Sequence, residues 1–169
     1  ARTSESAWWN VLAWTLRNGA TLAPIIGVLF WPLATRRAVL SAMAGGFGAG
    51  LTWYQLGGWQ PAMFHLGVHP VWIGMGTNLL ILMAVTLIEQ RTVLAVTRDH
   101  ALRRSGGILG FAALIIAATT ALAFGWLHER GLLGLSAFSA LALATAAATR
   151  LLRSAETPAE HVLQEAEAV

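Results

Sequence analysis

Long apolar segments alternate with short polar ones along this chain, and the pattern predicts membrane-spanning helices. The five apolar segments are residues 11–33, 38–55, 71–88, 107–127 and 131–149. A helix of about 20 apolar residues crosses the ~30 Å hydrocarbon layer of a bilayer. The segment 71–88 contains no charged side chain at all. We therefore expect an all-α integral membrane protein with about five transmembrane helices.

The amino-acid composition favours a bilayer over water as the surrounding medium. The 169 residues are 56% hydrophobic and 11% charged, with a mean hydropathy of +0.62. Soluble domains carry about 25% charged residues, so this chain lacks the charge needed to cover a water-facing surface. It also has no cysteine, which excludes disulfides, thiolate metal sites and a cysteine nucleophile.

The positions of the arginines predict an orientation in the membrane. The chain has 11 arginines and no lysine; eight of them follow the first, third or fifth apolar segment, and the others are Arg2, Arg17 and Arg130. Because positive residues gather in cytoplasmic loops, we expect an outside N-terminus and a cytoplasmic C-terminus in the plasma (inner) membrane. The arginines lie between apolar segments and not in one patch, so nucleic acid is not an expected partner. The expected partners are the lipid bilayer and other transmembrane helices.

The charge pattern divides the chain into four expected regions. Residues 1–90 form a three-helix membrane region, and residues 91–106 form a basic cytoplasmic connector that could lie along the membrane surface. Residues 107–153 form a two-helix membrane hairpin. The acidic, alanine-rich tail 154–169 is expected in the cytoplasm, as a short helix or a disordered segment.

A ridge of small residues predicts the site where the helices pack together. Ala42, Gly46 and Gly50 recur at every fourth position of the glycine-rich segment 42–50, so on a helix they share one face. Such a face lets another helix approach backbone to backbone, which is how helices associate in lipid. We expect these three residues to form the packing hub of the bundle.

Two histidines are the candidate cofactor ligands, though only weakly indicated. His65 and His69 are four residues apart, so on a helix both would face the same way and could hold a metal, a haem or a chlorophyll-type pigment. No carboxylate lies nearby in the sequence to complete a metal shell or to orient an imidazole. The simpler interpretation is a pair of interfacial loop histidines, with His69 capping the turn before Pro70. We expect no metal site.

Two polar residues inside apolar segments leave alternatives open. Asn78 either binds an ion or solute or forms a hydrogen bond to a neighbouring helix. Arg17 either forms a buried ion pair or faces a substrate, or its side chain extends to the nearer membrane surface. The chain has no paired carboxylates, no partnered serine or threonine nucleophile and no phosphate-binding loop, so it is not expected to be an enzyme.

Part of the chain resembles a known family of transporters. The motifs that carry the resemblance are Gly19-Ala20-Thr21-Leu22-Ala23-Pro24, Gly27-Val28-Leu29-Phe30-Trp31, Ala34-Thr35-Arg36-Arg37-Ala38, the glycine-rich segment, Trp53-Tyr54, and Gly67-Val68-His69-Pro70 followed by Gly74, Asn78, Leu79 and Leu80. With these, residues 18–90 resemble the C-terminal part of sodium:solute symporters. The resemblance implies the last helix of a ten-helix inverted-repeat core and two peripheral helices behind it.

The resemblance implies a role in packing, not in binding. Symporters of this kind bind sodium and solute at the midplane where broken helices meet, and no part of this chain corresponds to those helices. The expected function is to pack and close the core of a sodium-coupled transporter, whose sodium would be bound elsewhere. The alternative is a small stand-alone accessory or scaffold subunit of a larger respiratory or photosynthetic membrane complex. Lipid, pigment or haem contacts are possible under that alternative.

Overall fold

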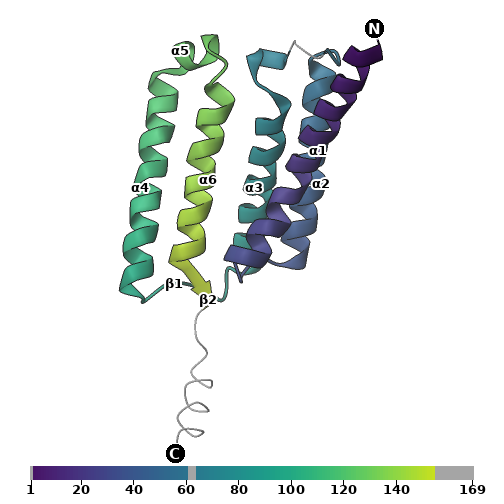
Figure 1. The fold of residues 1–169 in the computed structure, drawn as a ribbon. Coiled ribbons are helices and arrows are strands. Elements are labelled where there is room, and N and C mark those ends of the chain that lie inside the picture. Colours follow the sequence, from purple (N-terminus) through teal and green to yellow (C-terminus); the bar gives the residue numbers. More distant parts are fainter. Residues whose placement is uncertain (1, 61–63, 155–169) are drawn as a thin grey trace, which may run out of the picture.

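The computed structural model describes residues 2–60 and 64–154 and contains six α-helices in that part of the chain (Figure 1). Five are long: α1 (Arg2–Phe30), α2 (Arg36–Leu56), α3 (Pro70–Glu89), α4 (His100–Leu122) and α6 (Leu133–Leu151). The remaining elements are the 3-10 helix η1 (His65–Gly67), the helix α5 (Phe124–Glu129) and the strands β1 (Leu94–Val96) and β2 (Leu152–Ser154). The all-α fold is thus established, with one small two-stranded ribbon.

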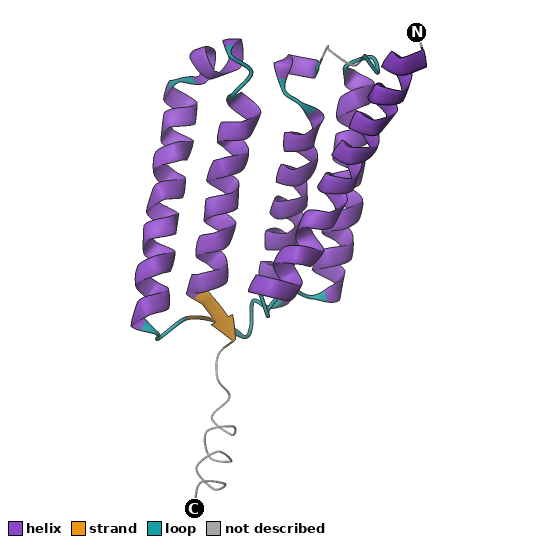
Figure 2. Ribbon diagram, in the orientation of Figure 1, coloured by secondary structure: helices purple, strands orange, loops and turns teal. Residues whose placement is uncertain are grey.

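The long helices lie side by side in two groups (Figures 1 and 2). Helices α1, α2 and α3 pack against one another, and α4 and α6 form a hairpin beside them. Helix α6 lies between α4 and α3 and makes the contacts that join the two groups. The start of α1 and the short helix α5 lie at one end of the bundle, and the β1–β2 ribbon lies at the other.

Three helices in the described part of the chain are long and apolar enough to cross a membrane, namely α3, α4 and α6. Helices α1 and α2 are as long but less apolar. In α2, glycine and alanine occupy the face that packs against the neighbouring helices, and these residues contribute little hydropathy. In α1, Asn10, Arg17 and Asn18 interrupt the apolar side chains.

Side-chain caps fix the starts of three helices. The Thr35 hydroxyl accepts from the Ala38 N–H at 3.0 Å, and the His69 Nδ1 accepts from the Val71 N–H at 3.2 Å. The Asp99 carboxylate accepts from the Ala101 and Leu102 N–H groups. These contacts satisfy N–H groups that have no partner within the first turn of a helix.

Several segments differ from the expectation drawn from the pattern of apolar residues. Within the basic connector 91–106, β1 pairs with β2, and α4 already begins at His100. The fourth apolar segment is divided, since α4 ends at Leu122 and the short helix α5 follows it. Apolar composition alone does not predict where a helix ends within an apolar segment. Of the expected acidic tail, all but Ser154 lies outside the described residues.

The core of the three-helix group lies near its ribbon end. Trp31 and Leu82 are fully buried and pack with Ala23, Leu33, Ala38 and Ala42. Leu94 of β1 and Leu152 of β2 pack against this cluster. The ribbon therefore joins the end of the α4–α6 hairpin to the core of the three-helix group.

The register of the ribbon can be tested with paired cysteines, since the chain has none of its own. Leu94 lies opposite Ser154, and directly opposed residues have Cβ atoms about 4.5–5.5 Å apart. We expect Leu94→Cys/Ser154→Cys to form an intramolecular disulfide on mild oxidation, read as a gel-mobility shift that a reductant reverses. The matched control is Leu94→Cys/Arg153→Cys, whose side chains point to opposite faces of the ribbon. Equal crosslinking of the two pairs would contradict this register.

Candidate functional site

The helices of the first group meet at a junction of three glycines, one from each helix. Gly19 of α1, Gly46 of α2 and Gly74 of α3 meet there. A Cβ atom added to Gly46 would overlap the carbonyl oxygen of Gly19 and lie 2.8 Å from the carbonyl oxygen of Gly74. A Cβ atom on Gly74 would lie 3.4 Å from the Gly19 Cα. The three backbones therefore touch directly, with no side chain between them.

Asn78 of α3 joins the same three helices by hydrogen bonds. Its Nδ2 donates to the carbonyl oxygens of Gly19 at 2.8 Å and Ala42 at 3.0 Å, and lies 3.4 Å from that of Ala20. The side chain is fully buried, and its Oδ1 has no hydrogen-bond partner among the described residues. Of the two roles open to this residue, the geometry gives it the interhelical one.

The expected packing ridge faces this junction. Ala42, Gly46 and Gly50 are all buried on α2, and Ala42 belongs to the core cluster. A Cβ atom on Gly50 would make an ordinary contact with Leu16 at 3.5 Å. The position Gly48, on another face of the same helix, has nothing within 4 Å. Only the central glycine of the ridge thus requires the absence of a side chain.

The two candidate histidines are engaged in local structure. His69 caps α3 through its Nδ1, and its ring lies against Phe64 with the ring centroids 4.5 Å apart. The His65 ring meets the Trp53 ring edge to face, at 5.0 Å. Within residues 2–60 and 64–154, no group of three His, Cys, Asp or Glu side chains is placed to hold a metal ion. These contacts give the pair a structural role in the loop.

A third histidine lies beside this loop, and no pattern in the sequence indicates its position. His128 of α5 lies against Gly67, because a Cβ atom on Gly67 would be 3.5 Å from the His128 Cε1. Gly67 has a φ of 65°, a left-handed conformation that favours glycine. The approach of α5 to this loop depends on how the hairpin packs, which no local pattern encodes.

An aromatic cluster lies at the same end of the bundle, and the sequence does not predict the contacts between its rings. The Tyr54 ring meets the Trp8 ring edge to face at 5.2 Å and stacks on the Trp59 ring at 6.3 Å. The Tyr54 hydroxyl lies 3.2 Å from the Thr15 Oγ1. Rings with a polar edge are typical of the membrane–water interface, so the cluster marks one boundary of the bundle.

Arg17 projects from the outer face of α1. Its side chain is exposed, so it is not buried in an ion pair among the described residues. Two residues further along, Gly19 contacts Gly46, which lies midway along α2. Arg17 is therefore near the middle of the three-helix group and faces outward.

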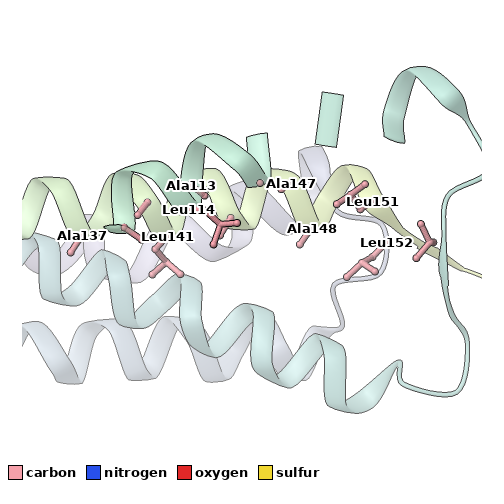
Figure 3. Close-up of a pocket in the computed structure, with 13 residues that line it drawn as sticks. Ala113, Leu114, Ala137, Leu141, Ala147, Ala148, Leu151 and Leu152 are labelled. Atoms are coloured by element: carbon pink, nitrogen blue, oxygen red, sulfur yellow. The ribbon is translucent and has the colours of Figure 1, made fainter. Parts of the chain in front are cut away.

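An apolar groove runs between the two helices of the hairpin (Figure 3). It has a volume of about 650 Å³. Its walls are mainly small side chains, and the residues from α4 and α6 are Gly110, Ala113, Leu114, Ala117, Ala137, Ala140, Leu141, Ala144, Ala147, Ala148 and Leu151. Val96 and Leu152 of the ribbon close one end. No residue in this groove was predicted as a site.

The junction predicts that Gly46 tolerates no side chain. We expect Gly46→Ala to lower the free energy of unfolding by about 1–3 kcal/mol, because the added methyl group must displace the Gly19 and Gly74 backbones. The measurement is unfolding in mixed micelles with rising sodium dodecyl sulfate, followed by tryptophan fluorescence. Gly48→Ala is the matched control. It should not lower the free energy of unfolding, since its methyl group enters open space. Equal effects of the two substitutions would refute the junction.

The cap on α3 predicts a dependence of stability on pH. Burial lowers the pKa of His69 from its ordinary value of 6.5, and a protonated imidazole cannot accept the Val71 N–H. The unfolded chain therefore binds a proton more readily, and stability should fall as the pH drops from about 6.5. We expect His69→Asn, which caps without titrating, to reduce this dependence in unfolding experiments at several pH values. His65→Asn is the control and should leave the dependence in place.

The chain was compared with protein-family models, with curated proteins and with solved structures. None of the three comparisons gives a match. The resemblance of residues 18–90 to sodium:solute symporters therefore remains an expectation from the motifs alone. The function must be argued from the geometry of the bundle.

Proposed function

We propose that this chain is a membrane-embedded packing unit and not an enzyme. All five long helices cross the bilayer, and the three-helix group α1–α3 serves as a rigid block against which further transmembrane helices pack. The observation that carries the proposal is the glycine junction of Gly19, Gly46 and Gly74. Contact between helix backbones is the main source of helix association where lipid surrounds them.

The outer surface of the bundle supports a bilayer around all five long helices. Large apolar side chains point outward on α1, α2, α3 and α4; Leu29 is 66% exposed, Phe111 67% and Leu114 70%. Phe47 of α2 is 44% exposed and Leu80 of α3 is 55% exposed. Large apolar side chains exposed on four helices are unusual for a monomeric soluble protein, whereas lipid solvates them without cost.

The distribution of charge supports the proposed orientation. Arg36 and Arg37 begin α2, Arg91 follows α3, and Arg150 ends α6, all at the end of the bundle that holds the ribbon. That end would be cytoplasmic, and the aromatic cluster around Tyr54 would lie at the outer interface. The N-terminus would then be outside and the C-terminal side of β2 inside.

The narrower form of the proposal is the C-terminal part of a sodium:solute symporter-like protein. In this form, residues 18–90 close and pack the transporter core, and the sodium and solute sites lie on helices outside this chain. The motifs quoted for the symporter resemblance support it. The burial of the ridge on α2 fits such a role, because a peripheral helix needs one closely packed face to lie against the core.

A second form is a stand-alone accessory subunit of a larger membrane complex. The observation that favours it is the position of α4, which packs on α6 and otherwise exposes most of its apolar surface. Such a helix is available to a partner. The engagement of His65 and His69 in ring contacts and in a cap argues for lipid, and not pigment, as the main non-protein contact of such a subunit.

The test is an intact-mass measurement on the polypeptide from its native membrane, with the masses of whatever co-purifies in mild detergent. A mass several times the 18.0 kDa of this chain would support the symporter-like form. A mass near 18.0 kDa with partner polypeptides in fixed ratio would support the accessory form. An 18.0 kDa polypeptide that stays monomeric and without partners in lipid would overturn the packing role itself.

A further inference from the structure

We propose that the groove between α4 and α6 binds an anionic phospholipid, with an acyl chain along the groove and the phosphate held by arginines at its ribbon end. The inference goes beyond a packing role and rests on it only for the position of the chain in a bilayer. It assigns a ligand of stated chemistry to the hairpin.

The dimensions of the groove suit one acyl chain. Its lining on α6 extends from Ala137 to Leu151, which is about 21 Å of helix at 1.5 Å per residue. One leaflet of a bilayer has a hydrocarbon thickness of about 15 Å. The groove therefore extends over the depth that an acyl chain occupies, and its walls are almost wholly apolar.

The groove is a furrow between two helices that are in contact. Helices α4 and α6 approach closely along it, since a Cβ atom on Gly110 would lie 3.7 Å from the Ala147 Cβ. A hydrocarbon chain can follow such a furrow, and a further helix can pack over one, as α1 packs on both α2 and α3. The charge at the end of the groove is what favours a lipid.

Positive charge gathers where the groove ends. The residues that close it, Val96 on β1 and Leu151 and Leu152 at the end of α6, adjoin several arginines in the sequence. These arginines, all at the ribbon end of the hairpin, are Arg98, Arg103, Arg104, Arg150 and Arg153. All but the half-buried Arg153 are exposed.

One of these arginines is placed to reach a headgroup at the groove. Arg103 precedes Gly110 by seven residues, so it continues the groove-lining stripe of α4 by two helical turns. Arg150 extends from α6 toward Ser105, whose Oγ lies 3.4 Å from its Nη1. Ser105 is two residues from Arg103 and faces the other side of α4, so Arg150 lies away from the groove. Asp99 is the acidic residue at this end of α4, and its carboxylate is occupied in capping that helix. The ribbon end of the groove thus combines surplus positive charge with an apolar furrow, which is the complement of an anionic lipid.

The test uses the full chain in mild detergent and two probes, palmitoyl-oleoyl phosphatidylglycerol and palmitoyl-oleoyl phosphatidylcholine, supplied in equal amounts. Native mass spectrometry counts the lipids that each protein molecule retains. We expect one phosphatidylglycerol to be retained in preference to phosphatidylcholine. We expect Arg103→Gln to reduce its retention about fivefold, since each arginine near an anionic surface contributes about 1 kcal/mol.

Matched controls separate this site from general attraction to charge and from loose boundary lipid. Arg36→Gln removes the same charge at the same end of the bundle but beside α2, and should leave retention unchanged. Ala117→Leu/Ala144→Leu fills the groove and should also abolish retention. Ala118→Leu/Thr119→Leu adds bulk to exposed positions of α4 outside the groove and should leave retention unchanged. Circular dichroism and the unfolding midpoint check that each variant is folded.

The result that overturns the proposal is equal retention of the two lipids, or a loss of phosphatidylglycerol that is the same in Arg103→Gln and Arg36→Gln. Retention that survives filling of the groove would also overturn it. A partner polypeptide that crosslinks inside the groove while no lipid is retained would assign the groove to a helix instead. A chain that needs no detergent to remain dissolved would refute the packing role in the membrane, which is a separate failure.

Discussion

Direct contact between the backbones of α1, α2 and α3 is the interaction on which the rest of the bundle depends. Gly19, Gly46 and Gly74 bring the three helices so close that one methyl group would separate them. Asn78 then reaches carbonyl groups on both neighbouring helices, which longer distances would not allow. In lipid, where apolar burial adds little between helices, this proximity is the main source of association.

Much of this arrangement follows from local sequence pattern, and some of it does not. The periodicity of Ala42, Gly46 and Gly50 locates the packing face of α2, and His69 before Pro70 marks the start of α3. Of the partners of that face, Gly19 stands in a similar run of small residues with Ala23 and Gly27, whereas Gly74 has no glycine or alanine four residues away. Tertiary packing decides that Gly19 and Gly74 meet Gly46, and no single-helix pattern contains that information. For the same reason, the groove and the approach of His128 to Gly67 could not be read from the sequence.

The two halves of the molecule use small residues for different purposes. In the three-helix group, glycine removes the space between helices and leaves no opening. In the hairpin, alanine lines a furrow that stays open to one side, although α4 and α6 are in contact along it. The three-helix group is thus suited to rigid packing, and the hairpin is suited to binding a ligand in its furrow. Hydropathy does not distinguish these uses, because both depend on which face of a helix meets a neighbour.

The ribbon of β1 and β2 has a consequence for the order of events during synthesis. Its strands, Leu94–Val96 and Leu152–Ser154, lie on either side of α4 and α6 in the chain. The first strand leaves the ribosome before either helix of the hairpin, and it has no partner until Ser154 has been made. Both helices of the hairpin must therefore be synthesised before the strands can pair. The ribbon is thus a contact that can form only after the whole hairpin has been made.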